Sequence, residues 1–475
     1  MERTAFATGA ATRIGRAVIT GGIVFMGILG TGCSLDDLIG ADQLPPDVTP
    51  PDITKTPAGA IAAYHGALIQ FRDAFGGVDG FVDVTGLLTD ELEHGSTAHL
   101  STAHLVDIRS TPAGSDVGAS LYSSLQRVRG QTSQAIGLLA EYAPGSEALR
   151  GRMYAIQAYA EIFLAELFCS GIPLSTLDYN GDFTYKPGST TEEVYTHALA
   201  LLDTALTLTG DSMRFAHLAR VGRARALLGL GRFAEAATAV AEVPDDFRYA
   251  VSYTADNAQT ERGQHFATLY NYLANPPTRS YLWFRSVGDR EGINGLDFVS
   301  SGDPRTRTTA TWGQDAKGRT IYHPSKYPND GSGEIVLASG VEARLVEAEA
   351  ALRSGDVTTW LNKLNHLRRT AWTMIEPPAS GPLPDLTDPG SERARVDLLF
   401  RERAFWLFLT GQRQGDLRRL IRHYGRAQDE IYPTGTYYTG RATAPARYGS
   451  DVDLPVPMAE QVSNPYYTGC IRRGA

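Results

Sequence analysis

The chain has 475 residues, a length that fits two or three average domains or one large domain built from repeats. Hydrophobic residues make up 43% of it and charged residues 20%, as in an ordinary folded protein. The formal net charge of -9 argues against nucleic acid as a partner, because a phosphate backbone favours a basic protein surface.

The first 32 residues have the pattern of an export signal. Three arginines precede an apolar run over residues 17–29, which is too short to span a membrane. Small residues then lead to Cys33, and this arrangement resembles a bacterial lipoprotein box, in which the cysteine becomes the acylated N-terminus. We therefore expect a lipoprotein signal peptide over residues 1–32 and lipidation at Cys33. The alternative is an ordinary signal peptide that is cleaved near Gly32.

Residues 33–56 are rich in Pro and Asp and lack a helical pattern, so we expect an acylated tether between the lipid and the folded body. Thr56 and Pro57 have the order of a helix N-cap and a first helical turn, and the apolar residues that follow keep helical spacing. The next stretch, 76–115, is mixed in composition, and we interpret it mostly as loop.

Long helices are predicted over residues 121–142 and 147–168, and the short link between them requires an antiparallel pair. A further helix opens at Thr190 and runs to Leu208.

Two later segments share the spacing of small and large residues that is typical of a tetratricopeptide-type helix pair. One spans 215–243, with Gly231 at its turn, and the other surrounds Gly355. The small residues allow close helix packing, and each glycine permits a tight turn. We therefore predict a mostly all-α domain over residues 57–475, with helical pairs over about 57–243 and 340–425.

Between these helical pairs, residues 245–339 form an irregular insertion that is rich in aromatic residues. Sugar rings stack on Trp and Tyr side chains, while carboxylates and amides bind their hydroxyl groups. Our candidate ligand-binding residues are Tyr281, Trp283 and Trp312, with Asp90 and Glu91 on the earlier loop as polar partners. The alternative is that these aromatic side chains only attach the insertion to the helices. The C-terminal segment, 426–475, is expected to be loop-like.

Residues 396–425 predict a buried helical hairpin without a reactive group. An apolar helix over Val396–Leu409 carries the charged triplet 401–403, and Gly411 is placed as its C-cap. Asp416 is placed as the N-cap of a second helix that ends at Gly425. We interpret the charged triplet and the pair of Arg413 and Asp416 as buried ion pairs that fix helix packing.

The sequence offers little reactive chemistry elsewhere. His94, His99 and His104 are five residues apart, a spacing that does not bring them to one face of a helix or a strand, so we predict no metal site. Residues 329–334 lack the alternating acids of a calcium-binding loop. No hydrolase, zinc-protease or phosphate-binding motif occurs, and we predict neither a cofactor nor an enzymatic activity.

Two cysteines remain after Cys33. In an exported protein, Cys169 and Cys470 suggest a disulfide bond that would attach the C-terminus to the end of a mid-chain helix. Two separate buried thiols are the alternative.

Several of these segments together resemble the SusD/RagB family of outer-membrane nutrient-binding lipoproteins. The family's hairpin signature is matched by Glu402, Arg403, Leu407, Gly411, Arg413, Asp416, Leu417 and Arg418. Trp406 and Thr410 depart from it, because both places usually carry glutamate. Further similarities lie at 155–174, 303–306, 342–352 and 454–465.

The resemblance implies a superhelix of about four tetratricopeptide-like helical pairs with long irregular loops. It also implies a non-enzymatic lipoprotein, anchored on the outer face of the outer membrane. Such a protein binds an oligosaccharide or peptide and delivers it to a SusC-like TonB-dependent transporter, for which it acts as the lid. A scaffold for envelope protein assembly and an exported glycosidase are the alternatives.

Overall fold

The computed structural model describes residues 54–77, 79–94, 102–253, 284–286, 291–310, 320, 322–327, 333–437 and 446–475. The chain divides into two compact units, Met1–Pro50 and Pro51–Ala475, and the described residues all belong to the second. The predicted signal peptide, Cys33 and nearly all of the predicted tether lie outside the described residues. No helix in the described ranges is long and apolar enough to cross a membrane.

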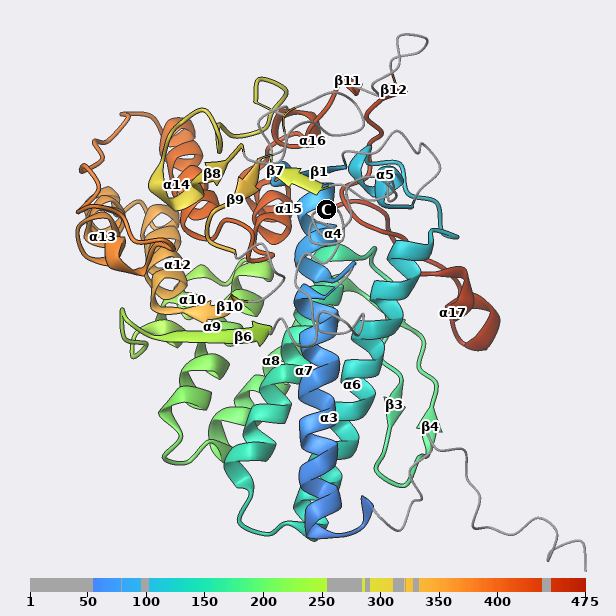
Figure 1. Cartoon of the computed structure of the whole chain (residues 1–475). Helices are drawn as coiled ribbons and strands as arrows, with labels where there is room; N and C mark the ends of the chain where they lie inside the picture. Colours follow the sequence, from blue (N-terminus) through green and yellow to red (C-terminus); the bar gives the residue numbers. More distant parts are fainter. Residues whose placement is uncertain are drawn as a thin grey trace, which may run out of the picture. The chain divides into compact units, whose positions relative to one another are not determined.

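Helices dominate the described part of the chain (Figure 1), as the sequence predicted. The α-helices are α3 (Pro57–Gly76), α4 (Phe81–Leu88), α5 (Thr102–Asp107), α6 (Asp116–Tyr142), α7 (Glu147–Leu167), α8 (Thr191–Leu208), α9 (Met213–Gly229), α10 (Phe233–Val240), α12 (Gly340–Arg353), α13 (Val357–Thr370), α14 (Glu392–Trp406), α15 (Arg413–Tyr424), α16 (Gln428–Ile431) and α17 (Met458–Ser463). Two short 3-10 helices are η3 (Pro304–Thr306) and η4 (Ala371–Met374).

The strands are short and pair antiparallel in twos. The pairs are β1 (Leu92–His94) with β7 (Phe284–Ser286), β2 (Ile172–Pro173) with β5 (Gly188–Ser189), β3 (Thr176–Leu177) with β4 (Phe183–Thr184), β6 (Arg248–Tyr253) with β10 (Gly333–Ser339), β8 (Thr308–Thr309) with β9 (His323–Pro324), and β11 (Thr436–Tyr437) with β12 (Ala446–Arg447). The longest pair, β6 with β10, brings the two ends of the aromatic insertion together.

Each long helix packs on the next one in the chain. α3 packs on α6, α6 on α7, α7 on α8, and α8 on α9, and the row continues through α10, α12 and α13 (Figure 1). This arrangement of consecutive antiparallel helices is that of the predicted tetratricopeptide-like pairs.

Local signals explain why these helices begin and turn where they do. The Thr56 side chain accepts a hydrogen bond from the backbone N–H of Gly59 at 3.0 Å, as expected for an N-cap. Thr190 and Glu193 form a reciprocal capping box at the start of α8. Gly231 and Gly355 have φ angles of 73° and 81° at the two predicted turns, a backbone region that favours glycine.

The interpretation of 76–115 as mostly loop is wrong. The segment contains the short helices α4 and α5 and the strand β1. Every residue of α4 is buried, because the helix lies inside the main apolar core, next to α3 and α15. A helix that is surrounded on all sides shows no amphipathic pattern, and this is why the periodicity of the sequence did not reveal it.

The predicted hairpin is present, but its boundaries differ. α14 ends at Trp406 rather than Leu409, and Gly411 has a φ of 76° in the link that follows. A side chain at this glycine would also meet the ring of Phe81 at 2.9 Å. Asp416 is not an N-cap, because α15 already begins at Arg413 and Asp416 is buried within its first turn.

Buried ion pairs hold this hairpin to the rest of the chain. Arg403 on α14 makes two hydrogen bonds of 2.9 Å to Asp416 on α15. Arg419 bonds both Asp416 and Glu349 of α12, which extends the cluster to a third helix. The expected ion pair between Arg413 and Asp416 is wrong, because Arg413 has a different partner.

Arg413 bonds instead to Asp90, at 2.7 and 2.9 Å, in the link between α4 and β1. In the charged triplet, Glu402 and Arg403 are buried, whereas Arg401 is partly exposed and pairs with Asp297. Ion pairs therefore join the hairpin to Asp90 and Asp297, which are distant from it in the sequence.

The chain's C-terminus is joined to the middle of the sequence. Cys169 and Cys470 form a disulfide bond with an S–S distance of 2.05 Å. Beside it, the backbone of Cys169 bonds Leu454 and that of Ser170 bonds Arg472. The loop-like C-terminal segment is thereby fixed at the end of α7.

We predict that Asp416→Asn lowers the free energy of unfolding by about 3–5 kcal/mol, because it removes the carboxylate that the buried guanidinium of Arg403 hydrogen-bonds and leaves it only Glu349, at 3.7 Å. The matched control is Asp388→Asn, which removes a carboxylate that pairs with Arg395 at the surface and should change stability little. Urea unfolding of both variants measures the difference. Equal losses in the two variants would contradict this role for Asp416.

We also predict that replacing both cysteines by serine, Cys169→Ser with Cys470→Ser, lowers the free energy of unfolding by about 3–5 kcal/mol. The bond joins residues 301 positions apart, and closing so long a loop restricts the unfolded chain strongly. Urea unfolding of the oxidised chain and the double variant tests this. An unchanged midpoint in the variant would show that the bond contributes nothing.

Candidate functional site

The sequence-predicted ligand residues have different positions in the structure. Tyr281, Trp283 and Trp312 lie outside the described residues, as does His99. Asp90 and Glu91 are described and are fully buried.

Asp90 and Glu91 face the hairpin rather than solvent. Asp90 accepts the two bonds from Arg413 and a third from the backbone N–H of Leu296. Glu91 accepts a bond of 2.8 Å from the backbone N–H of Leu409, and burial raises the pKa of its carboxyl to about 8. We therefore do not retain these two residues as ligand contacts, because inside the protein they already have structural partners.

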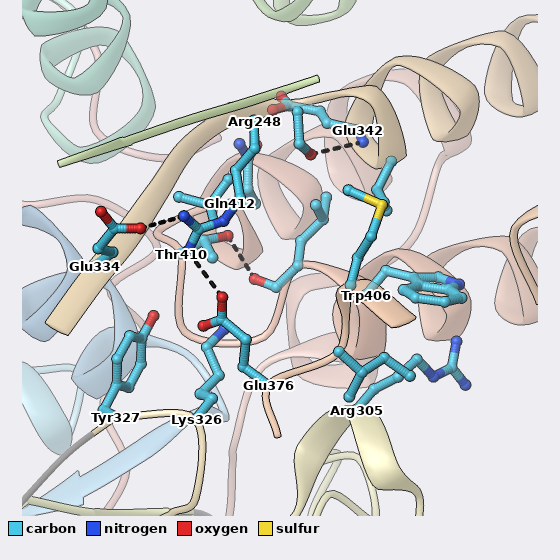
Figure 2. Close-up of a pocket in the computed structure, with 16 residues that line it drawn as sticks. Arg248, Arg305, Lys326, Tyr327, Glu334, Glu342, Glu376, Trp406, Thr410 and Gln412 are labelled. Atoms are coloured by element: carbon cyan, nitrogen blue, oxygen red, sulfur yellow. Dashed lines mark hydrogen bonds and ion pairs between the residues drawn. The ribbon is translucent and has the colours of Figure 1, made fainter. Parts of the chain in front are cut away.

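A pocket lies at the base of the aromatic insertion, where β6 and β10 meet the link between α14 and α15 (Figure 2). The insertion itself contributes Arg305, Lys326 and Tyr327 to the wall. Segment 374–376 closes another side. The enclosed space is about 80 Å³, enough for several water molecules.

Charged groups line one side of this pocket. Arg248 extends between Glu334 and Glu376 and pairs with both, as the dashed lines in Figure 2 show. Arg248 lowers the pKa of Glu334, so this carboxylate stays ionised. Burial lowers the pKa of the Lys326 ammonium to about 8, and its N–H groups donate to the carbonyl oxygen of Phe408.

An aromatic side chain forms the opposite wall. The Trp406 ring lies at the end of α14, and the guanidinium of Arg305 lies 5.0 Å from its centroid (Figure 2). Arg305 is itself held by Glu402, at 2.7 and 3.1 Å, and by Asp303. The signature residue Glu402 therefore positions the wall of the pocket through Arg305.

Two polar side chains deep in the pocket have unused hydrogen-bonding capacity. Glu342 is 2% exposed and Gln412 4%, and neither side chain has a hydrogen bond or ion pair within the described part of the chain. Burial raises the pKa of Glu342 to about 7, although Arg225 and Arg403 oppose this shift. Buried polar groups of this kind are normally satisfied by partners, so both are available to a polar ligand or to water.

The sequence predicted a binding region within the aromatic insertion, and it did not identify the residues of this pocket at the insertion's base as candidates. Trp406 and Thr410, noted only as departures from the family signature, both line it. That departure was the signal that could have found the site, because a tryptophan in place of a glutamate changes a charged wall into a stacking surface.

The histidines of the predicted loop are only partly described. His94 and His104 are buried, and their ring centroids are 5.9 Å apart. Among the residues that the structure describes, no group of three or more potential metal ligands occurs.

Solved structures with the same fold are known. A SusD superfamily protein from Bacteroides thetaiotaomicron matches with a TM-score of 0.62 and 17% identity, covering 88% of this chain and 100% of its own. NanU from Bacteroides fragilis matches with a TM-score of 0.61 and 15% identity, covering 91% and 99%. A SusD-like carbohydrate binding protein from Bacteroides vulgatus matches with a TM-score of 0.58 and 15% identity, covering 87% and 97%.

No protein-family model and no curated protein matches the sequence. The predicted SusD-like, mostly helical fold is nevertheless confirmed, because these structures match nearly from end to end. At such low identity the likeness concerns the fold.

We predict that wild-type stability falls as the pH rises from about 4.5 to about 7, in part because of Glu342. Its carboxyl has a higher pKa in the folded chain than in the unfolded one, so folding favours the protonated form and ionisation costs stability. The variant Glu342→Gln has no carboxyl to ionise at this position. Its free energy of unfolding, relative to that of the wild type, should therefore rise by up to about 3 kcal/mol between pH 5 and pH 7.5. Urea unfolding at the two pH values measures this, and parallel pH profiles would contradict it.

Proposed function

We propose that the chain is a divergent SusD-like lipoprotein that binds an oligosaccharide at the base of its aromatic insertion. It delivers this ligand to a SusC-like TonB-dependent transporter in the outer membrane. Cys33 carries the lipid, and residues 34–56 form the tether that holds the binding domain at the cell exterior.

The observation that carries this proposal is the pocket walled by Trp406 within a SusD-like fold. A flat ring next to groups that donate and accept hydrogen bonds suits a sugar, which has apolar C–H faces and polar edges. The similarity to a structure named as a SusD-like carbohydrate binding protein supports the same ligand class. Because the enclosed space is small, an oligosaccharide would place one edge in the pocket and extend outside it.

The proposed role is binding and transfer rather than catalysis. Glu334 and Glu376 are both engaged by Arg248, so neither is placed as a free nucleophile or base. An exported glycosidase would need Glu342 as its acid, since its raised pKa is the property that such a group requires. Hydrolysis of a bound oligosaccharide by the purified protein would favour that alternative.

We predict that Trp406→Ala weakens oligosaccharide binding at least about tenfold, because the stacking surface is lost. Calorimetry after a glycan-array screen measures the affinity. The matched control is Trp372→Ala, since Trp372 packs on the same small apolar cluster as Trp406 but does not line the pocket. The control should bind as the wild type does.

Two results would contradict this assignment. Wild-type affinity in Trp406→Ala would remove the pocket from consideration as the site. If Trp283→Ala or Trp312→Ala abolished binding in that case, the ligand would be held by the insertion itself, as the sequence first suggested. Absence of binding to any glycan would contradict the proposed function as a whole.

A further inference from the structure

A second cavity, separate from the Trp406 pocket, lies between α3, α7, the start of α9 and β6. It has a volume of about 310 Å³ and shares no lining residue with the first pocket. Its polar wall consists of His65, Arg72, Arg152, Arg214, Tyr249 and Ser252, and no carboxylate lines it. This concentration of positive charge is unusual in a chain whose net charge is -9.

Arg152 is half-buried in this cavity and bonds neutral side chains. Its Nε donates to the hydroxyl of Tyr249 at 2.7 Å, and a second N–H group donates to the hydroxyl of Tyr64 at 2.5 Å. It has no carboxylate partner within the described part of the chain. Other arginines of the chain differ in this respect: Arg225 pairs with Glu166, whereas Arg418 bonds only backbone carbonyl oxygens.

The two phenols that Arg152 bonds do not neutralise its charge, and one of them, Tyr249, lines the cavity. Tyr64 is 4% exposed and Tyr249 is 2% exposed. Each oxygen accepts a hydrogen bond from Arg152, so its own proton needs an acceptor, and none occurs among the described residues. Burial raises the pKa of Tyr249, which keeps that phenol neutral.

A second guanidinium acts on the same ring. The Arg214 guanidinium lies 5.0 Å from the Tyr249 centroid, and Arg152 lies 5.6 Å from it. Arg214 is in the first turn of α9, where the helix dipole adds positive potential and no acid is present.

Two carboxylates next to lining residues, Asp73 and Glu334, have partners of their own, and Glu334 also interacts electrostatically with Arg214. Asp73 pairs with Arg72, and Glu334 pairs with Arg248 and accepts from Ser252. The cavity therefore presents positive charge together with the O–H donor of Tyr249. Arg152 is half-buried, so an acceptor with negative charge would offset the cost of removing its guanidinium from water.

We propose that this cavity binds an oxyanion, either a carboxylate or a sulfate group. The group belongs to an acidic glycan or to a free inorganic anion, because both present the same charged oxygens. The guanidinium groups of Arg152 and Arg214 supply charge-assisted hydrogen bonds, and the hydroxyl of Tyr249 supplies a neutral one. The proposal goes beyond the proposed function and does not depend on it, since the Trp406 pocket is a different site.

Calorimetry at low ionic strength tests the site with three probes: sodium sulfate, an oligogalacturonide and a neutral oligosaccharide of equal length. We expect saturable binding of an anionic probe and about tenfold weaker binding in Arg214→Gln. Arg214 is exposed, so this variant should fold normally. Arg152→Met should weaken binding further, and its unfolding curve checks that it is folded.

The matched control is Arg150→Gln, which removes the same charge two residues away on α7, where Arg150 pairs with Glu147. It should leave anion binding unchanged. Binding of sulfate alone assigns the site to a free anion, and binding of the oligogalacturonide alone assigns it to a charged glycan. No anion binding, or equal affinity in Arg214→Gln and the wild type, would overturn the proposal, and so would equally Arg214-dependent binding of the neutral oligosaccharide.

Discussion

The hairpin of α14 and α15 belongs to both apolar cores of the folded unit. Phe405 and Phe408 lie in the core of α3 to α10, whereas Phe400 and Leu417 lie in the core of α12 to α15. Between these apolar contacts the hairpin carries buried charges, and several pair with residues outside it: Glu402 with Arg305, Arg413 with Asp90, and Arg419 with Glu349. A buried charge without its partner is strongly unfavourable, so these pairs restrict the two cores to one relative arrangement.

The same hairpin also builds the candidate site. Trp406 ends α14, and the link that follows supplies Leu407, Thr410 and Gln412 to the pocket. Glu402 fixes Arg305 of the aromatic insertion and also binds Arg368 of α13. The motif at 303–306 and the hairpin signature, which looked independent in the sequence, thus form one ion cluster. The signature residue Glu402 thus supports the pocket by holding Arg305 in its wall. Much of the rest of the wall comes from the link after α14, from segment 374–376 and from the aromatic insertion.

Much of the helical fold could be predicted because its signals are local. The cap at Thr56, the capping box at Thr190 and the turns at Gly231 and Gly355 each depend on residues within a few positions. The partner of Arg413 could not be predicted in this way, because Asp90 is 323 positions away and only the fold brings them together.

The candidate site depends even more on tertiary structure. Arg248 and Glu334 come from the two ends of the insertion, and they meet only because β6 pairs with β10. Asp90 and Glu91 were expected at an exposed loop, but α4 and the hairpin bury them. Composition drew attention to the insertion, whereas the identity of the side chains that line the candidate pocket required the packing of distant segments.

We propose that this chain binds a glycan on the cell surface and passes it to a transporter. Purification of the full-length chain from its own membranes, followed by mass spectrometry of everything that it retains, tests this most directly. We expect a TonB-dependent transporter and an oligosaccharide to co-purify with the chain. Recovery of the chain with other envelope proteins, but with neither a transporter nor a glycan, would contradict it and favour a scaffold.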